Sequence, residues 1–263
     1  MNKKLEIPIL MYHRVIREKD EEGVFGTYVY ENELRKQFEY LRSENIKPIT
    51  FSDIEEGILD KKNKVVVLTF DDGYSDNYTI LYPLLKEFGF KAVIYPVTEE
   101  DYNLWDSENK SNPEKKLQLM SWEEMRELND SGLIEFGAHT KTHCNLLETN
   151  NQLSFLEIEE SKKTLEKELD IEVLSFAYPY GFFNEEHKKI LEIVGYKYGV
   201  ATASGPVDFY EDLYHIRRIG IFSKDDIKRY KRKVKGNYNT KKVRDEKIKD
   251  FRRKIKGIFG WGK

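Results

Sequence analysis

The sequence contains a single cysteine, Cys144, among its 263 residues. One thiol cannot form a disulfide within the chain, so the composition fits a reducing compartment. Long apolar runs are absent, because none approaches the ~20 residues that a membrane-spanning helix needs. The N-terminal run is interrupted by Glu6 and Pro8 and lacks a small-residue cleavage site. We therefore expect no signal peptide and a cytoplasmic protein.

The chain is rich in charged residues, which make up 35% of it, and 39% of its residues are hydrophobic. This composition excludes global disorder and is enough for one large α/β domain. Residues 224–263 hold 17 Lys and Arg against 5 Asp and Glu, a net charge of +12, which leaves −15 on residues 1–223. We predict a folded domain over 1–223 and a basic, partly helical tail over 224–263.

Apolar patterning alternates between short β-type runs and amphipathic helices. The continuous run Val65–Phe70 is typical of a strand buried on both faces, and Ser52, followed by Glu55, matches the start of a helix. Repeated β–α units favour a parallel sheet, either open or closed into a barrel. The expected strands are 7–12, 46–49, 65–70, 92–97, 133–137, 173–177, 196–201 and 215–222, and the expected helices are 33–45, 52–59, 76–88, 122–129, 152–169 and 185–194.

Polar or backbone groups that can carry chemistry follow four of these strands. Asp71 and Asp72 follow the third strand, and His139 follows the fifth, with His143 four residues later. His13 follows the first strand, and the segment 178–181 follows the sixth. In parallel α/β folds the carboxyl ends of strands meet at one face. Adjacent acids also suit a turn or a helix cap. Taken together, however, two imidazoles and a carboxylate suit a catalytic ion of the Zn²⁺ type, with an open position for water.

The motif Thr69-Phe70-Asp71-Asp72-Gly73, with His139-Thr140-Lys141-Thr142-His143 further on, resembles the polysaccharide deacetylase family (carbohydrate esterase family 4, NodB homology domain). Three further segments resemble the permuted branch that includes the poly-N-acetylglucosamine deacetylases: 9–15, 176–181 and 216–220. The resemblance covers about residues 5–222 and implies a distorted (β/α) barrel, usually of seven strands.

The resemblance also implies roles for individual residues. Asp72, His139 and His143 would bind one divalent metal ion, with Zn²⁺ preferred over Co²⁺, Ni²⁺ or Mn²⁺, and Asp71 would be the general base. The general acid would be His13 in the permuted branch, whereas Leu213-Tyr214-His215 formally matches the motif that supplies it in most members. We favour His13.

The chemistry agrees with these roles, since a bound metal lowers the pKa of water toward ~7 and polarises a carbonyl. The family pattern adds the backbone N–H of Tyr180, beside Pro179, as a partner for the oxyanion and the substrate. One departure is Ala177, where most members carry the arginine that orients the catalytic aspartate. We hypothesise that Arg218 takes its place.

Several other residues have weaker signals. Tyr74, Tyr178 and Trp105 have aromatic faces that suit a sugar groove. We interpret His187 as a residue on a helix surface and Cys144 as a small buried thiol rather than a fourth ligand.

The tail segment 251–261 mixes cations with apolar residues that share one helical face. Such a helix suits an anionic membrane surface, and packing against the acidic domain is the alternative. The sequence does not favour nucleic acid as a partner, because no recognition fold accompanies the charge. A membrane contact would make the protein peripheral at the inner membrane face.

The sequence thus predicts a metal-dependent hydrolase that removes the N-acetyl group from an N-acetylated amino sugar, as a polysaccharide, an oligosaccharide or a lipid-linked sugar. One alternative is a deformylase or another C–N hydrolase acting on a lipid-linked sugar. The other is a non-catalytic protein that binds carbohydrate or a membrane surface.

Overall fold

The computed structural model describes residues 6–23, 25–58, 64–103, 105 and 116–235. The strands are β1 (Ile9–Tyr12), β2 (Arg14–Ile16), β3 (Tyr28–Tyr30), β4 (Lys47–Ile49), β5 (Val65–Asp72), β6 (Ala92–Pro96), β7 (Tyr102–Asn103), β8 (Leu117–Gln118), β9 (Ile134–Phe136), β10 (Ser175–Ala177), β11 (Tyr198–Val200) and β12 (Ile219–Gly220). The α-helices are α1 (Glu31–Ser43), α2 (Phe51–Glu55), α3 (Tyr82–Phe88), α4 (Trp122–Asp130), α5 (Asn151–Leu169), α6 (Glu185–Val194) and α7 (Ile227–Val234). A π-helix, η2 (Asn77–Leu81), precedes α3, and the short 3-10 turns are η1 (Lys19–Glu21), η3 (Leu146–Glu148) and η4 (Pro179–Gly181).

Parallel strands form the centre of the molecule. The main sheet has the order β12-β1-β5-β6-β9, with β4 paired to the start of β5. The pair β10–β11 continues it through single parallel bridges, Ala138 to Phe176 on one side and Val200 to Ile216 on the other. The described residues therefore contain a ring of seven parallel strands that closes through isolated bridges, which confirms the distorted barrel.

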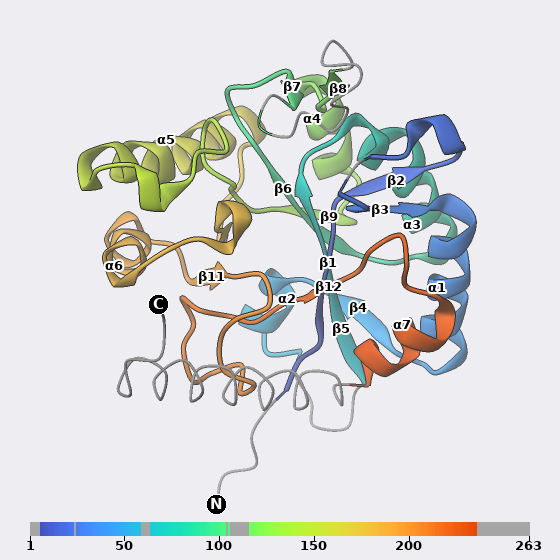
Figure 1. The fold of residues 1–263 in the computed structure, drawn as a ribbon. Coiled ribbons are helices and arrows are strands. Elements are labelled where there is room, and N and C mark those ends of the chain that lie inside the picture. The colour runs from blue at the N-terminus through green and yellow to red at the C-terminus, as the bar shows by residue number, and fades with distance from the viewer. Residues whose placement is uncertain (1–5, 24, 59–63, 104, 106–115, 236–263) are drawn as a thin grey trace, which may run out of the picture.

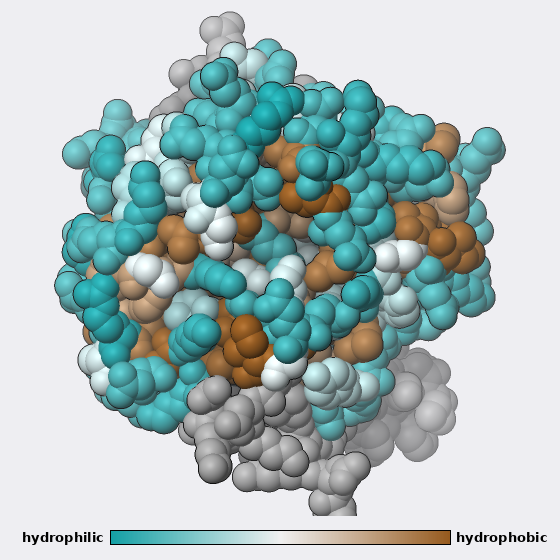
Figure 2. Space-filling view, turned by 180° about the vertical axis from the view of Figure 1, so that it is seen from behind, coloured by the Kyte–Doolittle hydropathy of each residue, from teal (hydrophilic) through white to brown (hydrophobic). Residues whose placement is uncertain are grey.

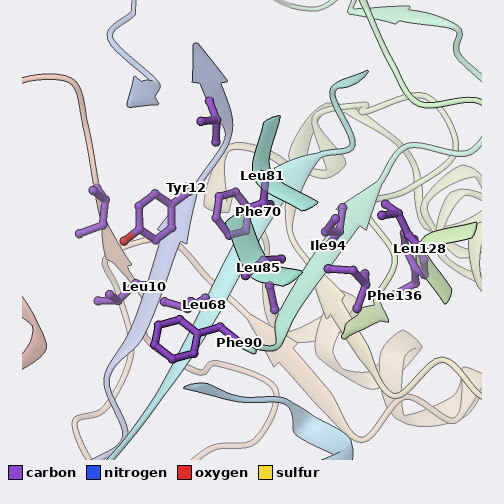
Figure 3. Packing of buried hydrophobic residues seen from close by; sticks show 14 of the residues in the cluster. Leu10, Tyr12, Leu68, Phe70, Leu81, Leu85, Phe90, Ile94, Leu128 and Phe136 are labelled. Carbon is purple, nitrogen blue, oxygen red and sulfur yellow. The ribbon is translucent and has the colours of Figure 1, made fainter. Parts of the chain in front are cut away.

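Helices cover the outside of the barrel, with α1, α3 and α7 on one side and α5 and α6 on the other (Figure 1). Alternation along β5 separates two apolar clusters: Leu68 and Phe70 face the helices, whereas Val67 belongs to a cluster that fills the barrel. Figure 3 shows the outer cluster, in which Tyr12 stacks on Phe70 at 4.8 Å between ring centres. The back of the molecule is mostly hydrophilic, with scattered apolar patches (Figure 2).

The structure refines several expected elements. Thr50, not Ser52, caps α2, and its partner in the capping box is Asp53. The expected helix 76–88 divides into η2 and α3, and the expected loop 98–119 contains the antiparallel pair β7–β8. The parallel pair β2–β3 was not expected.

The predicted boundary between domain and tail, at residue 223, precedes an ordered helix. α7 packs through its buried Tyr230, whose ring meets that of Tyr40 on α1 edge to face at 6.1 Å. A buried ion pair joins Lys233 and Asp225 at 2.6 Å. The tail from residue 236 lies outside the described residues. None of the helices in the described ranges is long and apolar enough to cross a membrane.

Candidate active site

The two aspartates at the end of β5 face the same site, although neighbours in a regular strand point to opposite faces. Asp71 continues the inward-facing series of Val67 and Thr69. Asp72 has a φ of 74°, and Gly73 has a φ of 77°. A Cβ at Gly73 would lie 2.8 Å from the Cβ of Pro96, so only glycine fits there. This strained turn brings Asp72 beside Asp71.

Asp72 meets the two histidines that follow β9. Its Oδ1 atom lies 3.4 Å from the Nε2 atom of His139 and 3.4 Å from that of His143. All three side chains are buried, at 2%, 2% and 5% exposure. The Nδ1 atom of His139 lies 2.7 Å from the carbonyl oxygen of Ala177, so Nδ1 carries the proton and Nε2 is left as the ligand atom.

These residues fit a divalent metal ion. Bonds of about 2.0–2.2 Å at tetrahedral angles separate ligand atoms by about 3.3–3.6 Å, and the two separations from Asp72 Oδ1 are both 3.4 Å. Potential ligand atoms of the three residues lie within 4.8 Å of one another. The Oδ1 atom of Asp72 is buried and makes no hydrogen bond, an arrangement that a cation would satisfy.

The protonation of the ligands also suits a metal. Burial lowers the pKa of His143, which keeps its imidazole neutral and able to coordinate. Burial by itself favours the neutral form of Asp72, but the neighbouring imidazoles of His139 and His143 hold the pKa of this carboxyl well below its usual value.

Asp71 is held by Arg218 rather than by the histidines. The two terminal nitrogens of Arg218 donate to Oδ1 and Oδ2 of Asp71 at 2.6 and 2.7 Å. Arg218 also donates to Thr69 Oγ1 at 3.1 Å and through Nε to the carbonyl of Ala201 at 2.7 Å. Burial would raise the pKa of Asp71, but the adjacent guanidinium outweighs it and lowers that pKa, so the carboxylate is ionised at neutral pH.

The two candidates for the general acid lie in different surroundings. His13 directly follows β1, and Tyr12 at the end of β1 pairs with Phe70, the residue before Asp71. His215 instead lies 2.9 Å from the hydroxyl of Ser204 and packs edge to face on Phe183. Of the two, His13 is the histidine that lies near the aspartates.

Aromatic rings lie around the metal-binding group. Trp105 stacks on the ring of His143 at 4.3 Å, and Tyr180 meets the same ring edge to face at 4.6 Å. Tyr180 has a φ of 59° and follows the buried Pro179 in η4. Its side chain is 40% exposed and that of Phe182 is 49% exposed, so both rings are accessible beside the site.

Two of the predicted groove residues are inside the molecule instead. Tyr74 is 1% exposed, and its hydroxyl is hydrogen-bonded to Asn103. Tyr178 is fully buried and donates to the carbonyl of Tyr214. These tyrosines support the loops around the site, since their rings are not presented to solvent.

The prediction that His187 lies on a helix surface is wrong. It is 1% exposed, and its Nδ1 atom accepts the backbone N–H of Asn184 at 3.1 Å as part of the cap of α6. Cys144 is half-buried and lies outside the metal-binding group. Burial, with the carboxylate of Glu157 next to it, raises the pKa of its thiol to about 12.

Sequence reasoning missed residues that hold the segment after β1. Asn77 is completely buried and donates to the carbonyl oxygen of His13 at 3.0 Å. Asp76 accepts the backbone N–H of Val15 at 3.0 Å and pairs with Arg14 at 3.3 Å. In the sequence, the only indication of this role was that Asp76 and Asn77 follow closely after the aspartate motif 69–73.

The chain is similar in sequence to known proteins. The family model for polysaccharide deacetylase matches residues 59–199. YxkH of Bacillus subtilis, which is named for the same family, is 30% identical over 222 residues, which cover 83% of this chain and 72% of YxkH. The poly-β-1,6-N-acetyl-D-glucosamine N-deacetylase of Staphylococcus aureus is 27% identical over 73% of this chain and 67% of its own.

Solved structures share the fold. The deacetylase PplD of Streptococcus pyogenes, solved with acetate, superposes with a TM-score of 0.75 at 24% identity, over 88% of this chain and 99% of PplD. IcaB of Ammonifex degensii gives 0.71 at 22% identity, over 88% and 96%. The chain belongs to the polysaccharide deacetylase family, as its motifs indicated.

Proposed function

We propose that this chain removes the N-acetyl group from an N-acetylated amino sugar by metal-dependent hydrolysis. The observation that carries the proposal is the pair of adjacent aspartates with different partners. Asp72 faces His139 and His143, whereas Asp71 is held by Arg218. One carboxylate is thus available as a ligand and the other as a base, as hydrolysis of an amide requires.

The residues have separate tasks in this reaction. A divalent ion held by Asp72, His139 and His143 would supply a Lewis acid that activates water and polarises the acyl carbonyl. We propose Zn²⁺, because two neutral nitrogens and one carboxylate oxygen at tetrahedral spacing are a set that zinc favours; Co²⁺, Ni²⁺ and Mn²⁺ are the alternatives.

Asp71 would take the proton of the attacking water, since Arg218 keeps its carboxylate ionised and fixes both of its oxygens. His13 would give a proton to the departing amine, which is otherwise a poor leaving group. The backbone N–H of Tyr180, next to Pro179, would donate to the oxyanion.

The substrate class follows from the rings beside the site and from the relatives. Tyr180 and Phe182 present partly exposed rings that can pack on a pyranose, and Trp105 lies against His143. The Staphylococcus aureus relative is named for β-1,6-linked N-acetylglucosamine polymers. We therefore propose oligomers of N-acetylglucosamine as the first substrate to test.

The test measures acetate released from β-1,6-linked N-acetylglucosamine oligomers while Zn²⁺ is added to the metal-free protein. We expect release to saturate at one equivalent of metal. Asp71→Asn should retain the metal and lose about 10²–10⁴-fold in rate. Formate release from an N-formylated sugar in place of acetate would favour the deformylase alternative. A fully active Asp71→Asn protein would refute the role of the base.

The predicted membrane contact is a separate proposal. The segment 251–261, for which the sequence predicts an apolar helical face, lies outside the described residues. Support comes from α7 and the residues on either side of it, which expose six cations: Lys224, Lys228, Arg229, Lys231, Arg232 and Lys235. Equal sedimentation with anionic liposomes, with and without residues 240–263, would reject this contact and with it a peripheral location on the membrane.

A further inference from the structure

The loop that joins the two metal-binding histidines has an unusual backbone. Thr140 has a φ of 64° and His143 has a φ of 58°, both in the left-handed region that residues with a side chain rarely adopt. This conformation turns the imidazoles of His139 and His143 toward the same oxygen of Asp72. A strained loop persists only when its surroundings hold it in place.

Glu157, on α5, holds the loop in this conformation. Its Oε2 atom accepts the backbone N–H of Lys141 at 2.9 Å and that of Thr142 at 3.1 Å. Its Oε1 atom accepts the hydroxyl of Thr142 at 3.0 Å. Glu157 is 6% exposed, so these charge-assisted hydrogen bonds are shielded from water.

Further contacts fix the same loop through Lys141. Its carbonyl oxygen accepts the backbone N–H of Glu99 at 3.0 Å. Its Nζ atom pairs with the carboxylate of Glu99 at 3.0 Å and with that of Glu160. These ion pairs are partly exposed and act on a flexible side chain, and Glu99 makes one bond to the backbone. Glu157 accepts three hydrogen bonds from the loop, two of them from its backbone, and is therefore the side chain that we test as its main restraint.

We propose that Glu157 is a positioning residue for the metal site, which holds the loop from Thr140 to His143 in the conformation that lets both histidines reach one ion. This inference rests on the metal site of the proposed function. Groups behind a ligand that fix its orientation typically change metal affinity by about 10–100-fold when they are replaced.

The experiment compares Glu157→Gln with Glu159→Gln. Glu159 is on the same helix and pairs with Lys163 one turn away, so its substitution controls for loss of a carboxylate from α5. Glu157→Gln removes the negative charge and leaves one accepting oxygen where the carboxylate has two, so the backbone N–H groups and the hydroxyl of Thr142 can no longer all donate to it. Zn²⁺ affinity is measured by competition with a chelator, and the visible absorption of bound Co²⁺ reports the coordination geometry.

We expect Glu157→Gln to weaken Zn²⁺ binding about 10–100-fold and to alter the Co²⁺ spectrum, with Glu159→Gln within about twofold of the wild type. Thr142→Val, which removes only the hydroxyl bond, should weaken binding less, and it carries the test if Glu157→Gln does not fold. Affinity within twofold of the wild type in Glu157→Gln, or in Thr142→Val when it is the only folded variant, would overturn the proposal.

Amide hydrogen exchange separates this proposal from the proposed function. The N–H groups of Lys141 and Thr142 should be protected in the metal-free wild type and exchange faster in Glu157→Gln. If the wild type binds no metal, the proposed function fails, and faster exchange in the variant still shows that Glu157 holds the loop. Unchanged protection of both amides would refute the role of Glu157.

Discussion

Replacing Arg218 tests whether this residue orients Asp71 in the active site. Its side chain is 0% exposed and that of Asp71 is 4% exposed, so the pair is sealed from water. Replacement by methionine keeps much of the aliphatic volume but removes both donors to Asp71. Removing one partner of a buried ion pair typically costs about 3–5 kcal/mol, because the remaining charge is buried and uncompensated. We expect a loss of this size in the free energy of unfolding.

The activity should fall as well, by about 10²-fold or more, because Asp71 loses the contacts that orient it as a base. Urea unfolding at a fixed metal concentration gives the stability, and acetate release gives the rate. In the double variant with Asp71→Asn, the stability loss should be smaller than the sum of the two single losses, by about 1–3 kcal/mol.

Arg217→Met is the matched control. Arg217 is also buried, at 6% exposure, but its Nε atom donates to the carbonyl of Gly205. Its stability loss should add to that of Asp71→Asn, and acetate release should remain. If Arg218→Met keeps wild-type activity, or if its stability loss is fully additive with that of Asp71→Asn, the idea that Arg218 orients Asp71 is wrong.

Three further predictions follow from single residues. His13→Ala should lower the rate of acetate release by about 10²–10⁴-fold, while His215→Ala should stay within a few-fold of the wild type; the opposite order would assign the general acid to His215. Gly73→Ala should lower the stability by about 1–3 kcal/mol and weaken Zn²⁺ binding, because the turn beside Asp72 needs a positive φ; unchanged unfolding and affinity would contradict this reading. Asp53→Asn should lower the stability at neutral pH by about 1–2 kcal/mol, as judged by urea unfolding.

The pH dependence of the Asp53 variant has a definite sign. Burial favours the neutral acid, yet Lys91 and the backbone N–H of Thr50 outweigh it and lower the pKa of Asp53 in the folded protein. A carboxyl with a lowered folded-state pKa stabilises above its unfolded-state pKa, and that contribution is lost as the pH falls through the folded-state value. The difference between wild type and Asp53→Asn should therefore shrink as the pH falls below the usual aspartate pKa of about 3.9 and through the lower folded-state value. A constant difference would show that the charge of Asp53 is unimportant.

The strands of the barrel could be predicted from the sequence alone, and so could the convergence of Asp72, His139 and His143. Continuous apolar runs such as Val65–Phe70 mark buried parallel strands whatever the details of their neighbours. Strand ends then place the side chains that follow them on one face, which is why residues as far apart as Asp72 and His139 were predicted to meet.

Contacts with residues distant in sequence determine where α2 begins, which the local sequence leaves ambiguous. Both Thr50 and Ser52 are followed three residues later by an acid that completes a capping box. The helix begins at Phe51 because that ring packs inside the barrel, 4.9 Å from the ring of Tyr198, and Thr50 becomes the cap. Nothing in the local pattern reports this distant partner.

Buried polar residues were the other source of error. Glu157 lies in a charged stretch of α5 that looks solvent-exposed, and its signal was only its spacing, three residues after Ser154 and four before Ser161 on the buried face. His187 and Tyr74 were likewise placed at the surface, because hydrogen bonds that make their burial tolerable come from residues 33 and 29 positions away, Ser154 and Asn103.

The central claim is that three side chains, distant in sequence, hold one divalent ion beside a separate aspartate. Anomalous diffraction at the zinc edge, from crystals grown with Zn²⁺, tests it most directly. The account predicts one strong peak within about 2.0–2.2 Å of a carboxylate oxygen of Asp72 and of the Nε2 atoms of His139 and His143. Asp71 should not coordinate the ion and should remain hydrogen-bonded to Arg218. A map with no peak among these groups, or with Asp71 as a ligand in place of Asp72, would contradict it.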